Sequence, residues 1–359
     1  MERRTWQGSR GGIVAIAIAV LAPPVAHADP ASPPVHLADT GLYSDPASHR
    51  IDARNLHYSP QYPLWSDGAV KSRWIFLPAG KAIDASDPDL WDFPVGTKVW
   101  KEFVFGRRVE TRYMEKVSEE KWRLATYVWS DDETDAIRAP DEGIRNHAEI
   151  APGKRHDIPG IADCASCHEG QRIQVLGFSA LQLSRDRDPG APHAEAATPD
   201  MVDLTILIER KRIASQPRDW VSHPPRITAT SPMERSALGY LHANCGSCHD
   251  RSTSLASIGM LLRQPASADE SQGPVGTTAV NQKGKFQIPG DASGGAFRIE
   301  PGDSARSTVV FRMASRNPMR QMPPLGTKVV DAEGLDLIRR WISGMGSDLR
   351  PTAHSEEKP

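Results

Sequence analysis

CASCH at residues 164–168 and CGSCH at residues 245–249 contain every cysteine of this 359-residue chain. Both pentapeptides have the frame Cys-x-x-Cys-His. Two thiols separated by two residues can reach both vinyl groups on one edge of a porphyrin, and the histidine that follows then lies under the iron. The frame therefore predicts two covalently bound haem c groups. The attachment residues would be Cys164, Cys167, Cys245 and Cys248, and the proximal iron ligands would be His168 and His249.

Two other functions of the cysteines, disulfide formation and zinc binding, have less support than covalent haem. Two disulfides could form in an oxidising compartment, and two Cys-x-x-Cys pairs could bind zinc. The 81 residues that separate Cys164 from Cys245 far exceed the spacing of a zinc ribbon. Neither alternative requires a histidine after each pair, so covalent haem is the favoured interpretation.

Residues 1–28 are typical of a secretory signal peptide. Three arginines make a basic start, an apolar run follows at residues 12–22, and Ala-His-Ala at residues 26–28 fits a cleavage site. The apolar run is too short to span a bilayer. No later segment is long and apolar enough to do so, and we expect a periplasmic protein without a transmembrane segment.

The composition excludes one class of partner. The chain is 39% hydrophobic and 25% charged, with a formal net charge of −2. Proteins that bind nucleic acid usually carry a dense basic face, so no nucleic-acid partner is expected.

Residues 231–345 are expected to form an all-α domain around the second motif. SPMERSALGYLHAN, which begins this segment, starts with a serine and a proline that suit an N-cap and a first helical turn. DAEGLDLIRRWISGM places four apolar residues on one helical stripe, between a cap at Asp331 and a stop near Gly344. Gly239, in the first helix, suits a close crossing of the two helices.

This helix pair resembles the N- and C-terminal helices of class I cytochromes c. The intervening stretch RIEPGDSARSTVVFRMASRNPMRQMPPLGT resembles the loop that supplies the sixth iron ligand in cytochrome c domains of multihaem and dehydrogenase-associated type. The resemblance implies Met322, in QMPP, as the distal ligand of the second haem. Its thioether favours ferrous iron. Met319 and Met313 are alternatives, as is the absence of a methionine ligand.

Residues 36–185 are expected to form a β-rich domain that ends in the first motif. Aromatic and β-branched residues alternate with charges in KSRWIFLP (71–78), KVWKEFVF (98–105), RRVETRYMEKV (107–117) and KWRLATYVW (121–129). The pattern predicts an antiparallel sheet with one face toward water. Six of the nine tryptophans lie within residues 65–129. A sheet core is their favoured interpretation, and a binding surface is the alternative.

PLWSDGAVKSRWIFLP, FPVGTKVWKEFVF, IADCASCHEGQ and VLGFSALQLS together resemble a family of bacterial dihaem c-type cytochromes of unassigned role. The likeness covers nearly all of the chain after residue 28. The N-terminal half is also similar to the single-haem cytochromes of the c-prime-beta group. That second likeness implies a five-coordinate iron, open to a small ligand, at the first motif.

No distal ligand for the first haem stands out from the sequence. Pro159 breaks the helix that would precede a class I haem motif. Met201 opens a predicted helix, DMVDLTILIERKRI, and is the leading candidate. The alternatives are Met233, His193 and His223.

The sequence thus predicts an α+β fold with a β-rich N-terminal domain followed by an all-α class I cytochrome c-like domain. A helical connector at residues 186–230 would join them, and a disordered tail would follow at 346–359. The expected function is electron transfer between a periplasmic redox partner, such as a dehydrogenase, and the respiratory chain. One alternative is a dihaem enzyme that acts on peroxide or nitrogen oxides at the first iron. Another is a partner- or polymer-binding β domain fused to a cytochrome.

Overall fold

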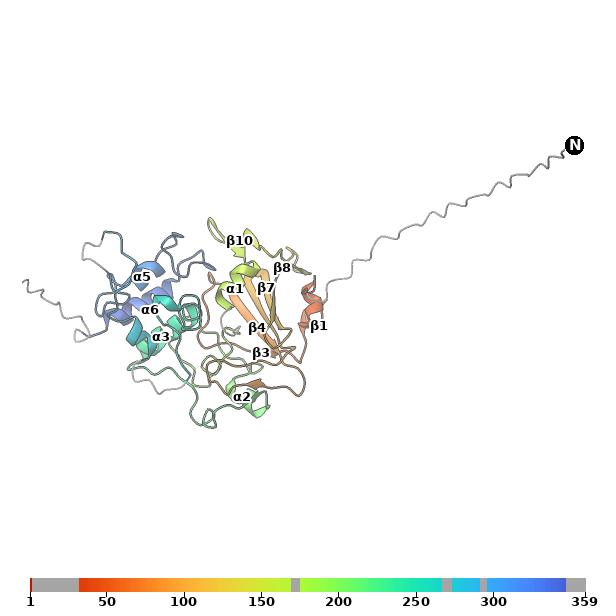
Figure 1. Ribbon diagram of the computed structural model, residues 1–359, viewed down its shortest axis with the longest axis horizontal. Coiled ribbons are helices and arrows are strands. Elements are labelled where there is room, and N and C mark those ends of the chain that lie inside the picture. Colours follow the sequence, from red (N-terminus) through yellow and green to blue (C-terminus); the bar gives the residue numbers. More distant parts are fainter. Residues whose placement is uncertain (2–31, 169–174, 267–272, 291–295, 347–359) are drawn as a thin grey trace, which may run out of the picture. The chain divides into compact units, whose positions relative to one another are not determined.

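The alternating segments form a six-stranded antiparallel sheet in a computed structural model of the chain, with the strand order β3-β4-β6-β7-β8-β9 (Figure 1). All four strands predicted from the sequence are confirmed. The strands of this sheet are β3 (Leu56–His57), β4 (Val70–Phe76), β6 (Lys98–Phe105), β7 (Arg107–Lys116), β8 (Trp122–Trp129) and β9 (Ala136–Arg138).

The structure describes Met1 and residues 32–168, 175–266, 273–290 and 296–346. The predicted signal peptide, beyond Met1, and the predicted tail, beyond residue 346, lie outside the described residues. Both therefore stay predictions.

Both faces of the main sheet are covered. On one face Trp100 and Tyr113 pack with Leu37, from the 3-10 helix η1 (Leu37–Thr40). On the other face Val99 and Met114 pack with side chains from residues 175–220. No residue of β6, β7 or β8 is exposed, so the predicted water-facing side is wrong. The charged residues of that side face an internal cavity instead.

Three two-stranded sheets complete the strand-rich region. They pair β1 (Tyr43–Asp45) with β2 (Arg50–Ile51), β10 (Ile144–Ala151) with β11 (Lys154–Ile158), and β5 (Ile83–Asp84) with β12 (Ile213–Ala214). The β5–β12 pair is parallel and ties the predicted connector to the strand-rich region.

The connector segment holds one α-helix, α2 (Leu204–Glu209). The helix predicted to open at Met201 begins three residues later because Asp203 is its N-cap, with a side-chain oxygen that accepts from the Ile206 N–H at 2.8 Å. Leu204 and Leu207 are buried in the same core as the sheet.

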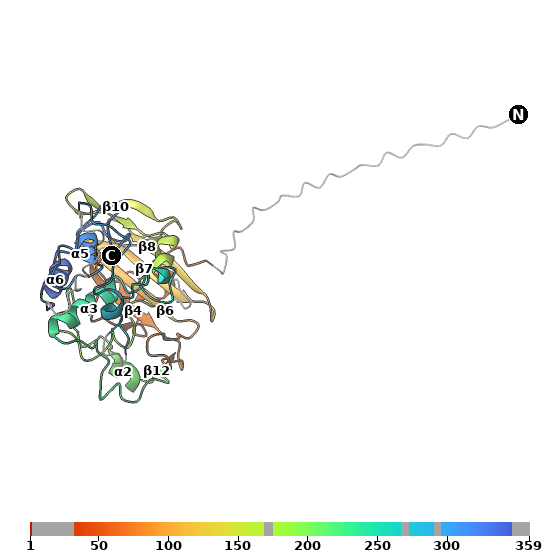
Figure 2. The ribbon, with the colours of Figure 1, turned by 60° about the vertical axis from the view of Figure 1, so that its left-hand side comes forward.

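Two longer helices dominate the C-terminal region, and both were predicted. These are α3 (Pro232–Asn244), capped by Ser231, and α6 (Ala332–Ser343), capped by Asp331. The remaining helices of the described chain are α1 (Ile161–His168), α4 (Pro274–Thr278), α5 (Thr308–Met313) and the 3-10 helix η2 (Ala256–Ile258). Figure 2 shows α3, α5 and α6 gathered together, and α3 packs directly on α6.

The close approach between α3 and α6 occurs at Gly334. A Cβ atom there would lie 2.2 Å from the ring of Tyr240 on α3. The prediction that Gly239 serves this crossing is wrong, because a Cβ on Gly239 would lie 2.1 Å from the ring of Tyr62. Gly239 therefore admits a side chain from the strand-rich region.

The motif PLWSDGA joins the two regions. The backbone N–H of Trp65 donates to Asn244 Oδ1 at 2.7 Å, and its indole N–H donates to the Val329 carbonyl at 3.1 Å. Asp67 Oδ1 accepts from the backbone N–H groups of Lys328 and Val329, both at 2.8 Å. These bonds fix the end of α3 and the segment before α6 against the strands.

The fold is thus α+β, with a strand-rich region followed by helices. The described residues from Pro33 onward pack as one compact unit. Within the parts of the chain that the structure describes, every helix is too short or too polar to span a membrane.

Candidate functional site

The two Cys-x-x-Cys-His motifs meet at one cavity of about 1050 Å³. Its walls come from the inner face of the sheet, from α1, from the end of α3 and from the loop before α6. The motif residues that line it are Cys164, Ala165, Ser166, Cys167, His168, Gly246, Ser247 and Cys248. Segments 81 residues apart in the sequence therefore share one compartment.

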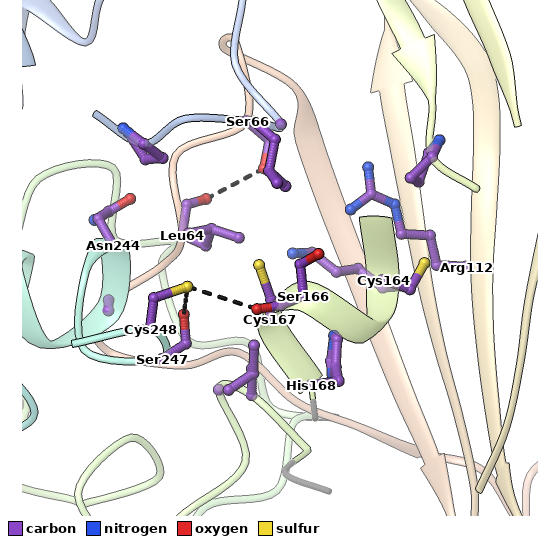
Figure 3. A pocket seen from close by; sticks show the side chains of 18 of the residues that line it. Leu64, Ser66, Arg112, Cys164, Ser166, Cys167, His168, Asn244, Ser247 and Cys248 are labelled. Atoms are coloured by element: carbon purple, nitrogen blue, oxygen red, sulfur yellow. Dashed lines mark hydrogen bonds between the residues drawn. The ribbon is translucent and has the colours of Figure 1, made fainter. Parts of the chain in front are cut away.

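The first motif forms most of the short helix α1, which lies against β8. The helix starts sharply after Gly160, where a Cβ atom would lie 2.7 Å from the Asp141 carbonyl oxygen. Asp163 Oδ2 accepts from the Gly160 N–H at 3.1 Å and pairs with Arg145 at 3.0 Å. No side chain of α1 is fully buried, and Figure 3 shows Cys164 beside Arg112 of β7.

The second motif begins at the C-cap of α3. Cys245 N–H donates to the Leu241 carbonyl at 2.9 Å, and the tight turn that follows requires Gly246, where a Cβ would lie 2.5 Å from the His242 carbonyl oxygen. Cys245 also lines a second, small cavity of about 20 Å³ together with Tyr240. Burial raises the pKa of Cys245 to about 12.

The motifs approach each other through Cys167 and Cys248. Cys248 Sγ lies 3.7 Å from the Ser166 carbonyl oxygen (Figure 3). A hydrogen bond from the Cys167 thiol lowers the pKa of Cys248 and raises that of Cys167. Side chains from both motifs are thus in direct contact.

The two motif histidines have different surroundings. His168 lines the main cavity. His249 does not; its Nδ1 is buried and has no hydrogen-bond partner among the described residues. Burial lowers the pKa of His249, which also has a hydrogen bond with the Met260 backbone. Histidines that bind a metal are neutral, use one ring nitrogen for the metal and often hydrogen-bond through the other to the backbone. His249, with one nitrogen bonded to the backbone and the other without a partner, fits this description.

Met322, the predicted distal ligand of the second haem, lies beside the second motif. Its side chain lines the small cavity with Cys245 and Met313, although His249 does not line this cavity. The Met322 N–H donates to the Arg312 carbonyl at 3.0 Å. Met319, an alternative ligand, is 84% exposed. The structure thus brings Met322 and Met313 near the motif, and the choice of ligand stays a prediction.

None of the four candidates for the distal position of the first haem lines the cavity that contains His168. Met201 forms a parallel β-bridge with His57 instead. His193 Nε2 donates to Asp331 Oδ1 at 2.9 Å, and its ring lies 4.8 Å from that of Trp65. Met233 is 39% exposed, and His223 bonds to the neighbouring Ser222 at 3.1 Å.

Three residues whose side chains could bind iron line the cavity and were not predicted from the sequence. They are Met114, His156 and His242. His156 Nε2 is hydrogen-bonded to Glu110 at 3.0 Å. His242 Nδ1 accepts from the Gln264 N–H at 3.0 Å, and burial lowers its pKa to about 3. The neutral His242 ring therefore carries its proton on Nε2 and is a donor. Its position one helical turn before Cys245 was the signal available in the sequence.

The cavity-facing side of the sheet carries a row of cations. Arg73 on β4, Lys101 on β6 and Arg112 on β7 are direct cross-strand partners, and Thr126 on β8 continues the row. An adjacent row, which includes Val99 and Met114, is apolar. The cavity wall thus combines an apolar strip with a basic one.

The groups that a covalent haem requires are divided between the two motifs. Both motifs have paired thiols, the second has a buried histidine with a nitrogen lacking a partner, and the first faces the apolar strip of the cavity wall. Among these residues no group of three or more His, Cys, Asp or Glu side chains is placed to hold a metal ion. Haem iron takes its equatorial ligands from the porphyrin and needs no such cluster.

Comparisons of the chain with protein-family models, with curated proteins and with solved structures found no match. Its function is therefore inferred from the residues of the cavity.

Proposed function

We propose that the chain is a periplasmic dihaem c-type cytochrome that transfers electrons between a redox protein, such as a dehydrogenase, and the respiratory chain. The observation that carries the proposal is the convergence of both Cys-x-x-Cys-His motifs on one cavity of about 1050 Å³. Two haems that exchange electrons would have to lie close together.

In this proposal the C-terminal region is a class I cytochrome c-like domain. The crossing of α3 and α6, with Gly334 against Tyr240, supports the comparison. His249 would be the proximal ligand of the second haem and Met322 the distal one. Residues 1–28 would direct export to the periplasm.

The chain's own residues have three tasks in this function. The four cysteines hold the cofactors covalently, so that neither can dissociate outside the cytoplasm. The apolar row of the sheet would keep water from the first haem, and burial of this kind is one way in which a protein sets the potential of a haem. The bonds of Trp65 and Asp67 to the helical region keep the two motifs at a fixed separation.

One observation favours a second function, an enzyme with an open iron at the first haem. Met201, Met233, His193 and His223 all lie away from the cavity that contains His168, which leaves Met114, His156 and His242 as the methionine and histidine side chains that line it. An iron without a sixth protein ligand can bind a small molecule such as peroxide, nitric oxide or carbon monoxide. Haem two would then supply electrons to that iron.

The third function considered from the sequence, a β domain that binds a partner or polymer, has less support. Trp91, Trp100 and Trp129 are each at most 7% exposed. Both faces of the main sheet are covered by other parts of the chain. These tryptophans therefore offer little exposed surface to a partner or polymer.

The test is to produce the chain with a cytochrome c maturation system and to count its covalent haems by mass spectrometry. Optical and EPR spectra with and without carbon monoxide then separate the first two functions. Two haems per chain, both low-spin and unaffected by carbon monoxide, are expected for the carrier. A high-spin haem that binds carbon monoxide would favour the enzyme, and a chain without covalent haem would rule out both.

A further inference from the structure

The basic row on the sheet extends away from the first haem-attachment motif. Cys164 lies beside Thr126 and Arg112, with which it interacts electrostatically or by hydrogen bonding. From Thr126 the row continues through Arg112 and Lys101 to Arg73, one strand at a time. At the usual spacing of neighbouring strands, Lys101 lies about 10 Å and Arg73 about 14 Å from the strand under Cys164.

The cations of this row have too few anionic partners. Arg112 pairs with Glu110 at 2.6 Å, and Arg73 pairs with Glu195 at 2.7 Å. The Lys101 side chain forms no hydrogen bond or ion pair with the described residues. Glu195, which pairs with Arg73, attracts Lys101 only at longer range, and Lys101 Nζ lies 4.8 Å from the centre of the Phe103 ring. Burial, together with the positive charges of Arg73 and Lys71, holds the pKa of Lys101 well below its usual value.

Arg73 adds a second sign that a ligand is missing from this wall. The residue is only 3% exposed and lines the cavity. Its Nη2 is buried and has no hydrogen-bond partner among the described residues. A buried guanidinium group without a full set of acceptors is costly, so an acceptor is expected to complete it.

We propose that Arg73 and Lys101 form a carboxylate-binding site in the main cavity, and that a propionate group of the haem attached at Cys164 and Cys167 occupies it. The proposal rests on the proposed function. In haem c the thioether bonds and the propionates lie at opposite edges of the porphyrin. A porphyrin held at Cys164 and lying along the row directs its propionate edge toward Lys101 and Arg73.

A free oxyanion, such as nitrite, has the same chemistry as a propionate and is the other source of a ligand for this site. The apolar row beside the cations favours the propionate. Val99, Met114 and Leu124 line the cavity next to the basic row, which suits the flat hydrocarbon surface of a porphyrin. A small hydrated anion would gain nothing from that surface.

The test compares holoprotein variants in an EPR-monitored redox titration. Lys101→Gln removes the charge, Lys101→Arg keeps it, and Lys98→Gln is the matched control. Lys98 is on the same strand, and its Nζ donates to the Thr40 carbonyl at 2.8 Å on the opposite face of the sheet. A His168→Met variant assigns the signals of the first haem. Lys101→Met, which keeps the contact with Phe103, replaces Lys101→Gln where haem content falls.

The expected result is a lower midpoint potential of the first haem in Lys101→Gln, because an unneutralised propionate stabilises ferric iron. A tenfold change in the one-electron equilibrium corresponds to about 59 mV, and we expect a shift of that order. Lys101→Arg and Lys98→Gln should stay near the wild type. The propionate bending bands in the resonance Raman spectrum should move in Lys101→Gln alone.

Unchanged potentials and Raman bands in all variants, with haem fully attached, would overturn this assignment and leave the proposed function intact. A tenfold loss of nitrite affinity in Lys101→Gln with unchanged propionate bands would also overturn it, in favour of a free oxyanion. Wild-type chain without haem at Cys164 and Cys167 would overturn the proposed function together with the assignment.

Discussion

The two Cys-x-x-Cys-His motifs have the same frame in different settings. The first lies on an eight-residue helix without fully buried side chains, against a sheet whose inner face carries cations. The second lies at the end of a 13-residue helix that packs on α6, with Met322 and Met313 close to Cys245. In the proposed function the pentapeptide would determine attachment and the proximal ligand, whereas the tertiary surroundings would determine what else reaches the iron.

This difference predicts two haems with different properties. A methionine thioether stabilises ferrous iron and would raise the potential of the second proposed haem. The first proposed haem would face a basic wall, and none of the sequence-based methionine or histidine candidates lines its cavity. Variants that remove one motif, or that disturb the contacts between the two regions, therefore test this comparison.

The largest expected effect is the loss of one haem. Cys164→Ala with Cys167→Ala should leave a chain with one covalent haem at the second motif, and Cys245→Ala with Cys248→Ala the reverse. The reason is that each pair of thiols forms its own thioether bonds. Intact-protein mass spectrometry counts the haems, with the wild type as reference. Two haems in either double variant would contradict attachment at these cysteines.

Next in size is the effect of the distal ligand of the second haem. Met322→Ala should abolish the weak near-infrared band of methionine-ligated ferric haem and lower the potential of that haem, because the soft thioether is lost. Met313→Ala tests the other methionine of the small cavity, and the exposed Met319→Ala is the control. Loss of the band in Met313→Ala alone would reassign the ligand.

Local patterns in the sequence were sufficient for the elements on both sides of the comparison. Alternation predicted β4, β6, β7 and β8, and the caps at Ser231 and Asp331 predicted the starts of α3 and α6. These features depend on neighbours within a few residues. The frame of each motif is local in the same sense.

What the sequence did not reveal depends on residues that are far apart in the chain. Lys101 reads as a solvent-facing charge within an alternating strand, yet cross-strand partners place it in a basic row on a cavity wall. The sequence suggests that Gly239 allows two helices to cross closely, yet Gly239 packs against Tyr62, which lies 177 positions earlier in the chain. Met201 was expected to open a helix, yet the helix begins at Leu204 and the backbone of Met201 pairs with His57. No local periodicity encodes such contacts.

A third prediction measures the coupling between the two regions. Gly239→Ala should destabilise the holoprotein by about 1–3 kcal/mol, because the new methyl group would overlap the ring of Tyr62. Gly346→Ala is the control: a Cβ atom there has nothing within 4 Å, and we expect a change within about 0.5 kcal/mol. Urea unfolding monitored by haem absorbance gives both values. Equal stabilities for the two variants would mean that Tyr62 moves aside freely.

The smallest expected effect is a pH-dependent one at the bridge between His193 and Asp331. This bridge ties residues that follow the first motif to the N-cap of α6. The hydrogen bond to Asp331 raises the pKa of His193, and the same bond helps to lower the pKa of Asp331 against the effect of burial. Unfolded histidine has a pKa of about 6.5. The stability that His193 contributes is therefore fully present below that pH and is lost as the pH rises through the folded pKa.

His193→Gln should accordingly lower the urea midpoint most near pH 6 and least near pH 9. The difference should amount to at most about 1 kcal/mol, because the His193 side chain is 24% exposed and partly screened by solvent. His223→Gln is the matched control, since the only hydrogen bond of the His223 side chain among the described residues is to its neighbour Ser222, and this variant should give a difference that does not follow this pH dependence. A gap between wild type and His193→Gln that widened toward pH 9 would show that the bridge does not depend on a protonated His193. In that case Asp331 would cap α6 without help from the region of the first motif.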